Sequence, residues 1–108
     1  MNNLLKETKE KLAEHGKSWK DVHYVSVYDN FSEQKAISIP VFKKVINRNY
    51  DDGYGHPEVN ESLEIVGDDW WLERHEYDGS EWWEYKTKPV RPESIVTAID
   101  TARELIWE

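Results

Sequence analysis

The chain contains no cysteine, which excludes a disulfide framework and a cysteine nucleophile. Secreted domains of this size commonly depend on disulfides, so their absence favours a reducing compartment. Long apolar runs are missing too, and none approaches the ~20 residues that a membrane-spanning helix needs. The N-terminus becomes charged directly after Leu4 and Leu5, unlike a signal peptide. We therefore expect a cytoplasmic protein that does not cross a membrane.

Motifs of known catalytic chemistry are also absent. The segment from Tyr50 to Pro57 contains glycines but no Lys, Ser or Thr, so it is not a phosphate-binding loop. No Ser/His/Asp motif is present. The four histidines lie far apart in the sequence, without metal-ligand spacing: His15, His23, His56 and His75. We predict that the protein is not an enzyme and that it needs neither a cofactor nor a bound metal.

Acidic residues are abundant and unevenly distributed. The net charge is −8, and the excess lies in residues 50–85, where Arg74 is the one basic residue. The acids of this segment are Asp51, Asp52, Glu58, Glu61, Glu64, Asp68, Asp69, Glu73, Glu76, Asp78, Glu81 and Glu84. Such a segment repels phosphates, which argues against direct nucleic-acid binding and favours a basic partner.

Aromatic residues must supply much of the core. Hydrophobic residues make up only 38% of the chain, but they include six Trp and six Tyr. Each buried aromatic side chain removes roughly 150–250 Å² from water, so a few of them can replace many aliphatic residues. The length fits one compact domain, residues 1–108.

Apolar periodicity and capping residues predict three helices. The first lies between the N-cap candidate Asn3 and Gly16, and its apolar stripe is Leu4, Leu5, Thr8 and Leu12. The second follows Ser38, has Pro40 in its first turn, and buries Val41, Phe42, Val45 and Ile46. The third begins at Pro92 and buries Ile95, Ile99, Ala102 and Ile106.

Alternating patterns predict the strands. Residues 22–28 place Val25 and Val27 on one face of a strand, and residues 35–39 form a second, short strand. Residues 62–87 form a three-stranded antiparallel meander with turns at Gly67-Asp68 and Asp78-Gly79. The expected fold is α+β: this meander plus one or two N-terminal strands, packed against N-terminal, middle and C-terminal helices.

Turn length fixes which residues of the meander face each other. The Asp78-Gly79 turn places Glu73 opposite Glu84, and the Gly67-Asp68 turn places Ile65 opposite Trp70. One face then carries an apolar set, which is Leu63, Ile65, Trp70, Leu72, Trp83 and Tyr85. The other carries Glu64, Trp71, Glu73, His75, Tyr77, Trp82 and Glu84.

This second face is unusual for a solvent surface, because it opposes like charges and exposes tryptophans. Either Lys86 and other long side chains screen the carboxylates while a helix covers the tryptophans, or the face binds a partner. His75 between Glu73 and Glu84 also allows a divalent metal. The two carboxylates allow acid/base chemistry of the glycosidase type, although an open meander offers little of the cleft that a glycan needs.

Residues 67–85 read GDDWWLERHEYDGSEWWEY, and the preceding loop contains Tyr54-Gly55 and Glu58-Val59-Asn60. This stretch, under a fifth of the chain, resembles small uncharacterised proteins of phages and prophages of Gram-positive bacteria. The resemblance implies a provenance and transfers no catalytic or binding residue. Small acidic phage proteins include inhibitors of host nucleases and of CRISPR effectors (anti-CRISPR proteins), and several of these look like DNA mimics.

We therefore expect a phage-type accessory protein that binds and inhibits a host defence or nucleic-acid-handling protein in the host cytoplasm. Its partner would have a basic surface, as a nuclease or CRISPR effector does, and the chain would act as a DNA mimic. The expected partner-binding residues are Glu64, Trp71, Glu73, His75, Tyr77, Glu81, Trp82 and Glu84. A second candidate site is the loop with Asp51, Asp52, Tyr54 and His56. The alternative is a small-molecule or metal-binding module that uses the aromatic sheet face.

Overall fold

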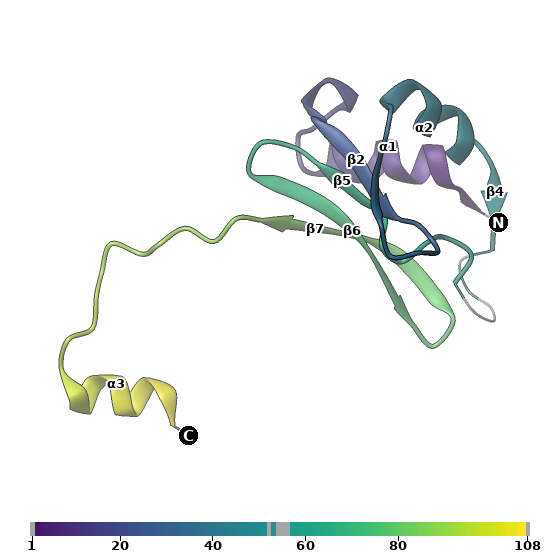
Figure 1. Ribbon diagram of the computed structural model, residues 1–108. Coiled ribbons are helices and arrows are strands. Elements are labelled where there is room, and N and C mark those ends of the chain that lie inside the picture. Colours follow the sequence, from purple (N-terminus) through teal and green to yellow (C-terminus); the bar gives the residue numbers. More distant parts are fainter. Residues whose placement is uncertain (1, 52, 54–56, 108) are drawn as a thin grey trace.

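The computed structural model describes residues 2–51, 53 and 57–107. Two helices pack on one face of an antiparallel sheet, and a third helix stands apart from it (Figure 1). In chain order the elements are β1 (Asn2–Asn3), α1 (Leu4–Glu14), a 3₁₀ turn (Trp19–Asp21), β2 (Tyr24–Tyr28), β3 (Gln34–Ile37), α2 (Ile39–Ile46), β4 (Asn49–Tyr50), β5 (Glu64–Val66), β6 (Trp70–Tyr77), β7 (Ser80–Thr87) and α3 (Ile99–Ile106). The predicted α+β class is confirmed. No helix in the described ranges has the length and apolar character to cross a membrane.

The main sheet has five strands in the order β3-β2-β5-β6-β7, and every neighbouring pair is antiparallel. Strands β5, β6 and β7 are the predicted meander, and the two predicted N-terminal strands extend it on the β5 side. Strands β1 and β4 form a separate two-stranded sheet. This small sheet ties the beginning of α1 to the segment that follows α2.

The β6–β7 hairpin has the predicted turn and register. Asp78 and Gly79 have φ angles of 52° and 87°, which is the left-handed backbone that a type I′ turn requires. Glu73 lies opposite Glu84 and Arg74 lies opposite Trp83, as the two-residue turn dictates.

The β5–β6 turn lies one position further along the chain than predicted. Ile65 is opposite Leu72 and not Trp70, and the Gly67 N–H donates to the Trp70 carbonyl at 2.9 Å. Asp68-Asp69 therefore forms the turn. A Cβ atom on Gly67 would lie 2.2 Å from the Trp70 indole, so that ring packs directly on the glycine backbone. The register changes by two residues, and since side chains alternate with a period of two, the two faces keep their predicted residues.

The core lies between α1, α2 and one face of the sheet, which we name the covered face. Trp70 and Trp83 both point into it and are each 2% exposed, so the predicted apolar face is confirmed. The buried meander residues of this face are Leu63, Ile65, Trp70, Leu72 and Trp83, with Tyr85 packed against them. From α1 the core receives Leu4, Thr8 and Leu12, and from α2 it receives Phe42 and Ile46.

The first two helices begin where their capping residues predict. The Asn3 side chain accepts a hydrogen bond from the Lys6 N–H at 3.1 Å, and Gly16 has a φ of 70° just beyond the end of α1. In α2 the predicted burial of Val41 and Val45 is wrong. Both are exposed, because only one stripe of this helix reaches the core.

The C-terminal region departs most from the prediction. The helix begins at Ile99 instead of Pro92, and none of its residues is buried. The predicted packing of Ile95, Ile99 and Ile106 is therefore wrong, since all three are exposed. Residues 95–97 are β-branched and stiff at χ1, which disfavours helix, and Arg91 offers no N-cap oxygen ahead of Pro92. Residues 88–98 instead carry α3 away from the sheet (Figure 1).

Candidate functional site

The sheet face opposite α1 and α2, which we name the open face, carries the predicted aromatic and acidic residues. Within the described residues no helix covers this face (Figure 1), so its tryptophans are not shielded in the way that one alternative required. Strand pairing places on it Tyr24, Ser26, Tyr28, Glu64, Trp71, Glu73, His75, Tyr77, Trp82, Glu84 and Lys86. Seven of the eight residues expected to bind a partner are among them.

An imidazole joins the two opposed carboxylates at the centre of the open face. His75 Nε2 lies 2.7 Å from Glu73 Oε2 and 3.3 Å from Glu84 Oε2. All three side chains are about one-third exposed. The imidazole therefore bridges both glutamates, which face each other across the two strands.

Neighbouring donors hold each carboxylate in place. The Trp71 indole N–H donates to Glu73 Oε1 at 2.7 Å, and Lys86 Nζ lies 3.3 Å from Glu84 Oε2. The His75 ring stacks on Trp82 with 6.3 Å between ring centroids. Lys86 therefore screens the Glu84 carboxylate, as one alternative from the sequence required. Aromatic and charged groups surround the two carboxylates and hold them in position.

Both carboxyl groups have a pKa below the ordinary value of 4.5. For Glu73, partial burial acts to raise the pKa, but the hydrogen bonds from Trp71 and His75 outweigh it and lower the pKa. For Glu84, the hydrogen bond from Lys86 lowers the pKa most, with the His75 charge adding to it. The pair therefore does not separate into one acid and one base, which argues against glycosidase-type chemistry.

Acid is expected to weaken the fold partly through Glu73. Because its folded-state pKa is lowered, its carboxylate adds stability that is complete above 4.5 and disappears as the pH falls through the lower folded-state value. Glu73→Gln should thus be less stable than the wild type at neutral pH, and the difference should shrink at pH values well below 4.5. Urea melts across this pH range measure the effect. A Glu73→Gln variant that is more stable at neutral pH would mean that repulsion from Glu84 dominates.

Two further members of the predicted set lie at the margins of this cluster. Glu64 is opposite Glu73 and is half-buried, which places a third carboxylate beside the central pair. Tyr77 is highly exposed at the end of β6, next to the hairpin turn. The open face thus extends from the tip of the β6–β7 hairpin across to Tyr24 and Tyr28 on β2, both of which are half-exposed.

Glu81 does not belong to the open face, and its prediction as a partner-binding residue is wrong. It lies on the covered face, and its side chain is 2% exposed. Arg74, which is 1% exposed, places Nη2 3.0 Å from Glu81 Oε1. Glu81 also accepts the backbone N–H groups of Glu58 and Val59 at 2.7 and 3.2 Å. Glu81 therefore anchors a loop and neutralises a buried cation.

Sequence reasoning missed the rest of this buried network. Arg74 Nη1 donates to Glu7 Oε2 at 3.1 Å, and its guanidinium carbon lies 4.8 Å from the centroid of the Trp83 ring. The Tyr50 hydroxyl donates to Glu7 at 2.8 Å and accepts from Arg74. Burial raises the pKa of Tyr50 far above its usual range. Burial acts to lower the pKa of Arg74, but the hydrogen bonds of Arg74 to Tyr50 and Glu81 outweigh it, so the pKa of Arg74 is raised. These groups hold α1, β4, β6 and β7 together.

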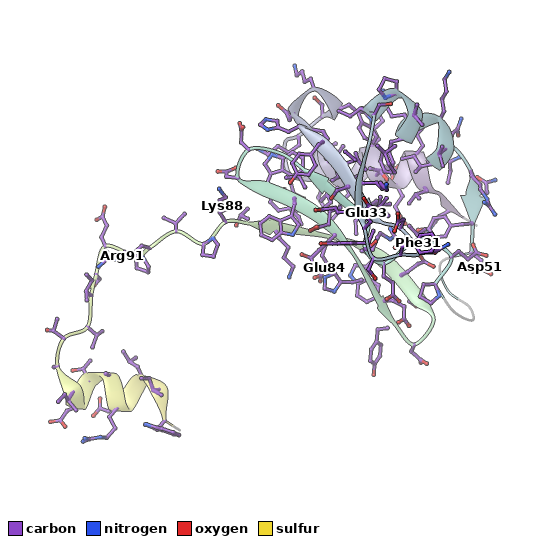
Figure 2. All side chains as sticks on the ribbon, in the orientation of Figure 1. Phe31, Glu33, Asp51, Glu84, Lys88 and Arg91 are labelled. Atoms are coloured by element: carbon purple, nitrogen blue, oxygen red, sulfur yellow. The ribbon has the colours of Figure 1, made fainter. Side chains whose placement is uncertain are left out.

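The second candidate site is described only in part. Asp52, Tyr54 and His56 lie outside the described residues. Asp51 accepts the Gly53 N–H at 3.1 Å with its side chain and donates its own N–H to Glu58 Oε2 at 2.9 Å. Asp51 lies beyond β4, well away from Glu84 (Figure 2). The structure therefore does not join Asp51 to the open-face cluster.

Among the described residues, no group of three or more His, Asp or Glu side chains is placed to hold a metal ion. The contacts of the His75 cluster are hydrogen bonds and ion pairs. Comparison with protein-family models, curated proteins and solved structures finds no match to this chain.

Proposed function

We propose that the protein binds a basic surface of a partner protein through its open face, and that the partner is a host defence or nucleic-acid-handling protein. Strand pairing brings together the open-face carboxylates Glu64, Glu73 and Glu84. In the complex they would take the place of nucleic-acid phosphates. The resemblance of residues 67–85 to phage proteins supports a host protein as the partner. Binding would block the partner's basic channel and so inhibit it.

The open face presents the same residue types that hold a guanidinium group on the covered face. There, Arg74 lies against the Trp83 ring and contacts the Glu81 carboxylate. On the open face, Trp82 and Glu84 occupy the next positions of the same strand. Carboxylates bind guanidinium and ammonium groups strongly, and tryptophan rings attract cations. The open face is thus suited to an arginine or lysine side chain from outside the molecule.

Reversing the two central charges should strongly weaken partner capture. Immobilised wild type and a Glu73→Lys/Glu84→Lys variant would be exposed to lysate of a Gram-positive bacterium and eluted with rising salt, and the captured proteins identified by mass spectrometry. We expect a partner that binds the wild type and is lost as salt screens the exposed charges. The variant should bind it at least about tenfold more weakly, since like charges then meet across the interface.

A matched control is Glu93→Lys/Glu104→Lys in the exposed C-terminal region that leads away from the sheet, which has the same net charge but leaves the open face intact. Capture that depends only on net charge would weaken equally in both variants, and the proposed site would be wrong. If Trp71→Ala or Trp82→Ala abolishes capture while the charge reversal does not, the partner is held by an aromatic hot spot and DNA mimicry is excluded.

A further inference from the structure

The C-terminal arm, residues 88–107, exposes apolar side chains that the sequence pattern predicts to be buried. Ile95, Ile99 and Ile106 recur at helical spacing, and all three are exposed, as are Leu105 and Trp107. The arm leaves β7 at Lys88 and passes Arg91 before α3 (Figure 2). It makes the molecule 55 Å long against 33 and 32 Å in the other directions.

An isolated helix of this length needs a packing partner. Helices shorter than ~12–15 residues are marginal in water, and in proteins their stability comes mainly from burying an apolar face. α3 has eight residues and no side-chain hydrogen bond at its N-cap. Its one described ion pair, Arg103 with Asp100 at 3.1 Å, is strongly exposed and contributes little. The helix is therefore expected to be stable only when its apolar face is covered.

An apolar surface of matching character lies beside α2. A cavity of about 260 Å³ lies there, and its apolar lining includes Leu4, Val27, Ile37, Phe42, Val45 and Ile46. Val45 and Val41, on the outer side of α2, extend this surface into solvent. The surface is continuous with the core, so a helix placed on it would extend the hydrophobic core directly.

Charge is compatible with contact between the two helices. One basic and one acidic residue, Arg48 and Glu58, line the cavity, so its charged lining is balanced. α2 itself carries Lys43 and Lys44 with no acidic residue, whereas α3 carries two acids, Asp100 and Glu104, against Arg103. The net charges of the two helices are thus of opposite sign, which favours their contact.

The direction of the arm favours the cavity of a second molecule over its own. The arm leaves the sheet at the end of β7 far from β4, while the cavity is lined by Tyr50 of β4 and by Arg48 (Figure 1). Pro89 and Pro92 fix their own φ angles and keep Lys88 and Arg91 extended, which holds the connector outward. The connector, residues 88–98, spans at most about 40 Å when extended, which suffices to reach a neighbouring copy.

We propose that two copies of this chain exchange their C-terminal arms, with α3 of each copy bound in the α2 cavity of the other. The exchange is reciprocal and buries both helices, which gives a closed twofold dimer. The open face of each copy remains outside this contact, so the inference is independent of the proposed function.

Light scattering in solution tests the dimer. The wild type should have twice the mass of a single chain, whereas removal of residues 88–108, Ile99→Glu or Val45→Glu should each give the mass of one chain. The matched control is Phe31→Glu, which adds the same charge at a highly exposed apolar residue of the β2–β3 loop (Figure 2). This control should remain dimeric. A wild type with the mass of one chain overturns the proposal.

Cysteine cross-linking tests the exchange itself, because the chain has no cysteine of its own. Val45→Cys and Ile106→Cys variants, mixed in equal amounts under mild oxidation, should form a disulfide-linked heterodimer. A mixture of Phe31→Cys with Ile106→Cys should form it at least about tenfold more slowly. In the Val45→Cys/Ile106→Cys double variant, a disulfide within one chain would show that the arm folds back on its own cavity, and the exchange would be wrong.

Discussion

Replacing Arg74 with methionine is expected to lower the free energy of unfolding by about 3–5 kcal/mol, because removing one partner of a buried ion pair leaves the other uncompensated. Glu81, 2% exposed, would keep its carboxylate in the core with only two backbone N–H donors. Trp83 would lose the guanidinium that lies 4.8 Å from the centroid of its ring. Urea denaturation followed by tryptophan fluorescence measures the loss.

Two further variants separate the charge from the packing. Arg74→Met/Glu81→Gln removes both charges and should recover much of the lost stability, which a double-mutant cycle quantifies. Lys35→Met breaks the ion pairs of Lys35 with Asp29 and Glu33 near the surface. It should lower the free energy of unfolding by at most about 1 kcal/mol. If Arg74→Met costs no more than Lys35→Met, the network does not hold the core together.

Trp83→Ala is expected to lower the free energy of unfolding by about 3–5 kcal/mol, as truncations of large aromatic residues in cores do. Its ring is 2% exposed, and its indole N–H donates to Thr8 Oγ1 at 2.9 Å, which links β7 to α1. The neighbouring Trp82→Ala is the matched control. Trp82 is 36% exposed on the open face, so its truncation should cost less than half as much. Denaturant melts that show the reverse order would mean that the two sheet faces are exchanged.

The meander was predictable because two local signals agreed. The Asp78-Gly79 turn fixes the β6–β7 register, and the alternation of apolar residues selects the covered face. The β5–β6 turn was misplaced because the role of Gly67 is tertiary: it accommodates the Trp70 ring and does not form the turn. Turn propensity alone cannot distinguish these two uses of a glycine.

Glu81 and Arg74 show how far the strand register predicts the core. The predicted register already placed Arg74 opposite Trp83 and Glu81 two positions from Trp83, so both belonged to the apolar face. The pattern alone does not predict their burial, because charged residues are rarely buried without a partner. Their partners Glu7 and Tyr50 come from distant segments, and no local signal identifies them.

The C-terminal helix was predicted from an apolar stripe that α3 retains from Ile99 onward, but no described residue of the same chain covers that stripe. Periodicity reports that Ile95, Ile99 and Ile106 share a side, and it does not say which molecule they pack against. The open-face cluster is the opposite case, since strand register brings Glu73, His75 and Glu84 together whatever the partner is.

The links between α1 and the β6–β7 hairpin also bear on how fast the protein folds. The Thr8–Trp83 hydrogen bond joins residues 75 positions apart, and the Glu7–Arg74 bond joins residues 67 apart. A hairpin with a two-residue turn forms locally in roughly 1–10 μs, but contacts of such long sequence separation require most of the chain to be ordered first. We therefore expect the docking of α1 onto the β6–β7 hairpin to limit the folding rate. A nascent chain that still lacks Ser80–Thr87 cannot close its core, because it already contains Thr8 but not Trp83, the other end of that docking contact.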